Sequence, residues 1–128
     1  MSTATVNQPS LKQRVNDLVS YIQNGKILEA MTEFYSANAT MRENNNPPTV
    51  GLAANIEREK QFLAYVKQWK SLAVEAVGVD AERGRTLVQI NFEFEAVDGK
   101  NVKYDQVAVQ TWKDGKIVDE KFYYDSAK

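Results

Sequence analysis

The residues best able to carry out acid–base chemistry are two glutamates that share strand faces with apolar side chains. On the last strand predicted from the sequence, Glu120 lies between Val118 and Phe122 in the alternating pattern. On a short strand earlier in the chain, Glu43 shares a face with Met41. Burial disfavours the charged form of a carboxylate and can raise its pKa by about 3–5 units. Both glutamates are therefore candidates for a general acid or base near neutral pH.

Each glutamate also has a simpler explanation. Strand ends often carry charges that reach solvent at the rim of a sheet, and glutamate is rarely fully buried. A β-bulge, which inserts one extra residue into a strand, is a further explanation for the place of Glu120 in the pattern. The sequence leaves these alternatives open.

Composition excludes several kinds of chemistry. The 128 residues include no cysteine and no histidine, which excludes disulfides, thiolate nucleophiles, serine–histidine triads and ordinary zinc sites. We therefore expect no metal and no cofactor. Sixteen Lys and Arg against seventeen Asp and Glu give a net charge of −1, whereas nucleic-acid binders show a basic excess. No nucleic-acid partner is expected.

The chain also lacks the patterns that direct proteins to membranes. No apolar run approaches the roughly 20 residues of a membrane span, so no membrane partner is expected. The first residues do not show the charged-then-apolar pattern of a signal peptide. Together with the absence of cysteine, this predicts a cytoplasmic protein.

The periodicity of apolar residues predicts one α+β domain over 10–128, after a frayed segment at 1–9. The predicted helices span about 11–22, 27–35 and 52–69. The predicted strands span about 39–43, 72–80, 85–97, 102–113 and 116–125. Asp-Gly pairs at 98–99 and 114–115 predict tight hairpins, so the last four strands should form an antiparallel meander. Helices that precede a run of strands favour the α+β class, with an antiparallel sheet covered by three helices.

The strand faces indicate which side of the sheet the helices cover. Apolar residues alternate with polar ones along 85–97, and the covered face there carries Val88, Ile90, Phe92 and Phe94. On 102–113 the pattern is ambiguous. If Trp112 belongs to the covered face, Tyr104, Gln106 and Gln110 share that face as polar groups.

Val107 and Val109 would then lie on the open face of the sheet. An antiparallel sheet with an apolar patch on its second face usually buries that patch against another subunit. This predicts a homodimer through Val107 and Val109. Scattered surface valines that need no partner are the alternative.

Several sequence segments carry a resemblance to a known family. They are Phe34-Tyr35, Ala39-Thr40-Met41-Arg42-Glu43-Asn44, Pro47-Pro48-x-x-Gly51 and Asp114-Gly115-Lys116-Ile117-Val118. With the order of elements, they resemble the SnoaL-like branch of the nuclear-transport-factor-two-like superfamily, which also contains ketosteroid isomerases and polyketide cyclases. The resemblance covers about 11–125. It implies a cone-shaped sheet of the cystatin-like kind, with a mostly apolar pocket in its mouth that binds a small hydrophobic molecule.

The resemblance also implies roles for particular residues. Glu43 falls where ketosteroid isomerases keep their catalytic aspartate. Leu18 and Ala108 stand where those enzymes keep two oxyanion donors, so neither donor is present in this chain. The candidate replacement donors are Tyr104, Gln106, Gln110, Tyr124 and Glu120. The predicted pocket lining is Leu18, Met41, Val88, Ile90, Phe92, Phe94, Tyr104, Gln106, Gln110, Trp112, Phe122 and Tyr124.

Three functions follow from this pattern. The first is an apolar pocket that binds a small hydrophobic molecule. The second is a cofactor-free enzyme of the isomerase, cyclase or hydratase type that uses Glu43 as general acid or base and Glu120 as acid or donor. The third is a non-catalytic dimeric interaction module. Tyr21 and Tyr35 are interpreted as packing residues, because aromatic side chains on a helix stripe usually pack.

Overall fold

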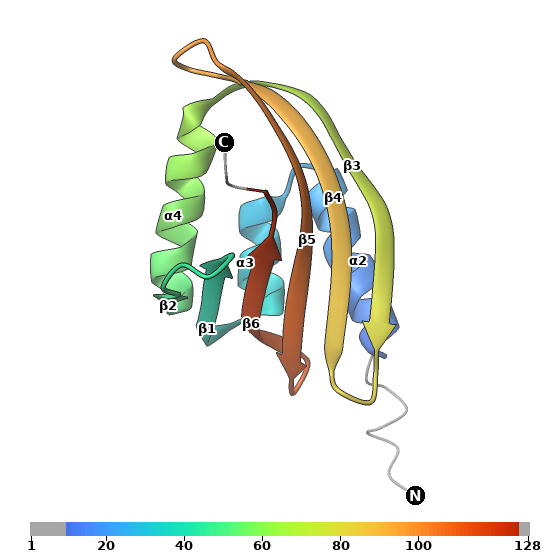
Figure 1. Ribbon diagram of the computed structural model, residues 1–128. Coiled ribbons are helices and arrows are strands. Elements are labelled where there is room, and N and C mark those ends of the chain that lie inside the picture. The colour runs from blue at the N-terminus through green and yellow to red at the C-terminus, as the bar shows by residue number, and fades with distance from the viewer. Residues whose placement is uncertain (1–9, 126–128) are drawn as a thin grey trace, which may run out of the picture.

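A computed structural model describes residues 10–125 of the protein (Figure 1). Residues 1–9, for which fraying is expected, and residues 126–128 lie outside the described part. The described helices are α2 (Leu11–Gln23), α3 (Ile27–Phe34) and α4 (Leu52–Tyr65). The strands are β1 (Tyr35–Glu43), β2 (Thr49–Val50), β3 (Val66–Asp80), β4 (Arg85–Ala96), β5 (Asn101–Lys113) and β6 (Lys116–Tyr123). The α+β class is confirmed.

The strands form one sheet in the order β2-β1-β6-β5-β4-β3. The last four strands make the predicted antiparallel meander. The expectation of a wholly antiparallel sheet is wrong at one place, because β1 pairs in parallel with β6. Parallel neighbours require a long crossover connection, and here α4 together with β3, β4 and β5 provides it.

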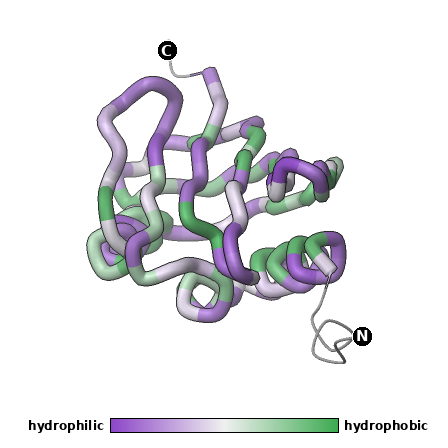
Figure 2. Tube along the Cα trace, turned by 90° about the horizontal axis from the view of Figure 1, so that it is seen from below, coloured by the Kyte–Doolittle hydropathy of each residue, from purple (hydrophilic) through white to green (hydrophobic). Residues whose placement is uncertain are grey.

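The sheet is strongly curved, and β3 is the strand that bends most (Figure 1). The pairing of β4 with β5 is unbroken from Arg85–Thr111 to Glu95–Asn101. The pairing of β3 with β4 is instead interrupted three times. Such irregularities bend a strand and increase its twist, which curves the sheet around the helices. Figure 2 shows the three helices side by side along one side of the sheet, which we call the inner face.

Two element boundaries differ from the sequence prediction. Helix α4 ends at Tyr65, and Trp69 belongs to β3, where it pairs with Phe94. Tyr35 does not end α3 but begins β1. In both cases, pairing with a strand distant in the sequence overrides a local periodicity that also suits a helix. None of the helices in residues 10–125 is long and apolar enough to cross a membrane.

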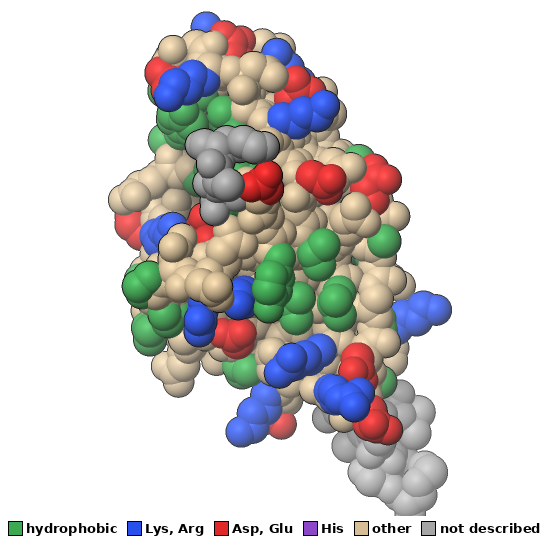
Figure 3. All heavy atoms as spheres, viewed as in Figure 1, with side chains coloured by type: hydrophobic (Ala, Val, Ile, Leu, Met, Phe, Trp, Pro, Cys, Tyr) green, Lys and Arg blue, Asp and Glu red, His purple; other side chains and the backbone are tan. Residues whose placement is uncertain are grey.

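The other side of the sheet, the outer face, carries a small apolar patch. Val109 pairs with Leu87, and Val107 pairs with Tyr123 on the same face. Figure 3 shows hydrophobic side chains gathered there, with charged side chains around them. Leu87 is 41% and Tyr123 is 47% exposed. The open-face position expected for Val107 and Val109 is thus the one observed, and homodimer formation through it stays a prediction.

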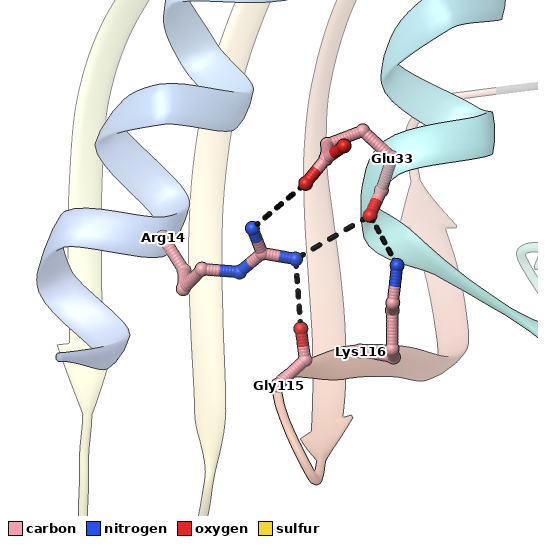
Figure 4. Close-up of polar contacts among 4 residues, drawn as sticks. All are labelled: Arg14, Glu33, Gly115 and Lys116. Carbon is pink, nitrogen blue, oxygen red and sulfur yellow. Dashed lines mark hydrogen bonds and ion pairs between the residues drawn. The ribbon is translucent and has the colours of Figure 1, made fainter. Parts of the chain in front are cut away.

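Arg14 joins three elements at the end of the molecule where the β5–β6 turn lies (Figure 4). Its Nη2 donates to the carbonyl oxygen of Gly115 at 2.8 Å and to that of Glu33 at 3.4 Å. Its Nη1 pairs with the Glu33 carboxylate at 3.3 Å. The guanidinium also lies 4.4 Å from the centre of the Phe34 ring. Arg14 therefore ties α2 to the end of α3 and to the turn between β5 and β6.

We expect Arg14→Leu to lower the free energy of unfolding by about 2 kcal/mol, because charged hydrogen bonds of this kind contribute roughly 1.5–3 kcal/mol. Urea denaturation followed by circular dichroism measures the change. Arg83→Leu is the control, since Arg83 pairs with Asp80 but is 70% exposed. Equal, small effects of both substitutions would contradict the role assigned to Arg14.

Candidate functional site

Glu120 is buried in the middle of the sheet, with only 3% of its surface exposed. The hydroxyl of Tyr35 in β1 donates to its Oε1. Nε2 of Gln110 in β5 donates to its Oε2 at 2.7 Å. Both carboxylate oxygens thus have a partner, as a buried charge requires.

A β-bulge explains how Glu120 comes to point inward. Thr111 pairs with Asp119, but the next residue, Trp112, pairs with Ile117, so Val118 is the extra residue. Ile117 is fully buried in place of Val118, which the sequence pattern had assigned to the inner face. The carboxylate of Glu120 is therefore buried, and the explanation as a solvated charge at the rim of the sheet is wrong. The strand does contain a bulge, but the residue that the bulge displaces is Val118 and not Glu120.

Burial raises the pKa of Glu120 from 4.5 to about 7. The hydrogen bonds from Tyr35 and Gln110 act in the opposite direction, because they stabilise the ionised form. The nearby charges of Glu59 and Asp119 raise the pKa further. Glu120 is thus an acid that titrates near neutral pH.

Glu43 lies at the rim, and 41% of its side chain is exposed. The hydroxyl of Tyr124 donates to its Oε1, and Arg58 on α4 pairs with its Oε2 at 3.3 Å. Burial, followed by the effect of Glu43, raises the pKa of Tyr124. Of the two glutamates predicted to face the interior, Glu120 does so fully and Glu43 only in part.

Glu59 on α4 is an acidic residue that the sequence analysis missed. Burial raises its pKa, the charge of Glu43 adds to the effect, and Arg58 opposes it. A signal was present in the sequence, because Glu59 lies three residues after Ile56 and four before Leu63, on the apolar stripe of the helix. The same reasoning that singled out Glu120 on a strand would have found it.

The predicted pocket residues divide into two groups on the inner face. The fully buried group pairs and packs within the core: Leu18, Val88, Ile90, Phe94, Gln110 and Trp112. The other group is only half-buried: Met41, Phe92, Tyr104, Gln106, Phe122 and Tyr124. In the half-buried group the Tyr104 ring lies 5.3 Å from Phe92 and 5.2 Å from Tyr124, measured between ring centres.

Two shallow depressions mark the surface of the described residues. One is lined by Ser20, Tyr21, Asn24, Lys26 and Glu29, around the turn between α2 and α3. The other lies across β3, β4 and β5 and includes Phe92 and Tyr104 from the predicted lining. Within residues 10–125, no group of three or more acidic residues is arranged to hold a metal ion.

The match to a family model shows to which protein family the chain belongs. Residues 15–120 match the model of the SnoaL-like domain. The chain belongs to the SnoaL-like domain family. No functionally curated protein matches it at a significant level.

Solved structures of other SnoaL-like and related proteins share the fold. A protein from Mesorhizobium loti, provisionally named a SnoaL-like polyketide cyclase, is 20% identical with a TM-score of 0.79, covering 91% of this chain and 100% of that one. A provisionally named isomerase from Bacillus subtilis is 16% identical, with a TM-score of 0.73 and coverages of 91% and 87%. TerC, co-crystallized with polyporic acid, is 14% identical, with a TM-score of 0.73 and coverages of 91% and 92%. At these identities the likeness shows the fold.

The raised pKa of Glu120 predicts how the stability of this SnoaL-like domain depends on pH. Between pH 4.5 and about 7 the folded protein keeps the Glu120 proton while the unfolded chain releases it. The free energy of unfolding therefore falls as pH rises through this range. In Glu120→Gln this contribution is absent. The free energy of unfolding of the variant should therefore rise relative to that of the wild type, by up to about 3 kcal/mol, as the pH increases from 4.5 to 8.

Urea denaturation of both proteins at several pH values measures this difference. Glu75→Gln, which changes an exposed glutamate of β3, serves as the control and should follow the wild type. A constant difference between Glu120→Gln and the wild type across the range would show that Glu120 does not titrate as described.

Proposed function

We propose that the half-buried part of the inner face, formed by Met41, Phe92, Tyr104, Phe122 and Tyr124, binds a small, largely apolar molecule. The observation that carries the proposal is that these side chains stay partly exposed next to carboxyl groups with raised pKa values. Apolar surface left open beside perturbed acids is typical of binding and catalytic sites. Leaving this apolar surface exposed makes the free energy of unfolding lower than it would be if the same side chains were fully packed.

The position of α4 supports this part of the inner face as the binding region. Helix α4 contacts β1, β2, β3 and α3. Its apolar residues Leu52, Ile56 and Leu63 remain only half-buried, and Asn55 is its one fully buried residue. A ligand between α4 and the sheet would cover this apolar surface together with the aromatic rings. TerC, co-crystallized with polyporic acid, is a protein of the same fold that was studied with a small organic molecule.

A panel of small aromatic alcohols and ketones, such as 2-naphthol and acetophenone, tests the proposal by thermal denaturation. A compound at 100 times its Kd should stabilise the protein by about 2.7 kcal/mol, which raises the melting temperature measurably. Tyr104→Ala should reduce this rise, because Tyr104 contacts Phe92 and Tyr124 at the proposed site. Tyr123→Ala on the outer face is the matched control, and it should show the same rise in melting temperature as the wild type. No shift across a broad panel, or equal losses in both variants, would argue against the proposal.

Proton transfer at Glu43 is the second candidate function. Glu43 accepts the Tyr124 hydroxyl proton in a hydrogen bond and lies at the edge of the proposed binding region. In this reaction Glu43 takes a proton from a carbon next to a carbonyl group, and the electron pair moves onto the carbonyl oxygen. The hydroxyl of Tyr124 turns from Glu43 to donate its hydrogen bond to that oxygen. Return of the proton to another carbon completes an isomerisation without any co-reactant.

Deuterium incorporation into a bound ketone, followed by NMR in heavy water, measures this proton transfer. Glu43→Gln should slow it by roughly 10²–10⁴-fold, which is the usual contribution of a general base. Glu57→Gln on the exposed side of α4 is the control. Binding with no exchange in the wild type, or unchanged exchange in Glu43→Gln, would leave ligand binding as the function and remove catalysis by Glu43.

A further inference from the structure

A continuous chain of side-chain hydrogen bonds runs from β5 through β4 and back to β5 before it ends on Glu120. Nε1 of Trp112 donates to Oγ1 of Thr86 at 2.8 Å. Oγ1 of Thr86 donates to Oε1 of Gln110 at 2.6 Å, and Nε2 of Gln110 donates to Oε2 of Glu120 at 2.7 Å. All of these residues, with Tyr35 on the other side of Glu120, are at most 8% exposed. Buried networks of this kind are costly unless every member is satisfied.

The chemistry of the donors sets the direction of the chain. An indole N–H can only donate, so the Thr86 oxygen must accept from Trp112. The one proton of the Thr86 hydroxyl is donated to Oε1 of Gln110, so the amide oxygen faces Thr86. The NH₂ group of Gln110 consequently faces Glu120. Reversing the amide would place its oxygen against the carboxylate and its NH₂ group against the Thr86 proton.

We propose that Thr86 and Trp112 are positioning residues that lock the side-chain amide of Gln110, so that only the Glu120 oxygen facing Tyr35 can share a proton with a neighbour. The amide nitrogen of Gln110 has no lone pair to accept a proton, whereas the Tyr35 hydroxyl can both donate and accept. When Glu120 is protonated, its proton therefore lies toward Tyr35, and the Tyr35 hydrogen must turn elsewhere. This arrangement goes beyond the proposed function, because it holds whether or not a ligand binds.

The other groups that act on Glu120 come from several elements of the fold. Tyr35 comes from β1, Gln110 from β5 and Asp119 from the same strand as Glu120. Glu59 comes from α4 and is close enough to raise the pKa of both Glu120 and Tyr35. The two charged groups that act on Glu120, Asp119 and Glu59, are thus both acidic. They favour its protonated form, while the locked amide favours its ionised form.

Carbon-13 NMR titration of the glutamate carboxyl carbons tests the lock without any ligand, and Glu120→Gln identifies the Glu120 signal. Thr86→Val removes the hydroxyl but keeps the shape of the side chain. The Gln110 amide can then turn and accept the proton of Glu120, so the pKa of Glu120 should rise by about one unit or more. Thr86→Ser keeps the hydroxyl and should restore the wild-type titration. Thr111→Val, on the outer face of β5, is the matched control.

The NMR signals of the Gln110 side-chain NH₂ group give a second readout. In the wild type and in Thr86→Ser these protons should exchange slowly with solvent, and in Thr86→Val they should exchange at least about tenfold faster, since a freed amide breaks its bond to Glu120 more often. If Thr86→Val does not fold, Thr86→Ala is used in its place, because it removes the same hydroxyl. An unchanged Glu120 titration in the folded variant, or a shift in Thr86→Ser as large as in Thr86→Val, would overturn the proposal.

Discussion

A carboxylate can lie inside a sheet only if donors reach both of its oxygens, and the architecture around Glu120 follows from this constraint. A single buried acceptor without a partner costs about 1–3 kcal/mol, and a charged one costs more. Tyr35 supplies one donor from β1 and Gln110 supplies the other from β5. The parallel pairing of β1 with β6 brings Tyr35 to this place, and the bulge at Val118 turns Glu120 toward it. The two irregular features of the sheet therefore serve the same acid.

The inner face has a closed end and an open end, and the acid lies between them. At the closed end Arg14 holds α2, α3 and the β5–β6 turn together around the rings of Phe34 and Trp112. At the open end Phe92 of β4, Tyr104 of β5 and Tyr124 after β6 stay half-buried. In the function proposed above, the closed end fixes the strands and the open end, lined by rings, is a rigid frame for the ligand. Rigid placement of this kind lowers the cost of binding.

Much of the site could be read from residue types, but the pairing of acids with donors could not. The position of Glu120 among apolar residues indicated an unusual carboxylate, and the same pattern on α4 would have indicated Glu59. The donor that Tyr35 supplies to Glu120 could not be predicted from the sequence, because the two residues are 85 positions apart and meet only through the β1–β6 pairing. The apparent helical stripe led to Tyr35 being interpreted as a packing residue. In the structure it is buried and also donates to the acid.

Local patterns determined what depends on neighbours in the chain. The start of α2, the Asp-Gly hairpins, the meander and the alternation that buries Val88, Ile90 and Phe94 all follow from spacing over a few residues. Tertiary structure decided the ends of α3 and α4, the parallel strand β1, the register shift in β6 and the exposure of Glu43. Each of these depends on hydrogen bonds between strands that are distant in the sequence. The energy of such bonds outweighs a local preference, and no local pattern records it.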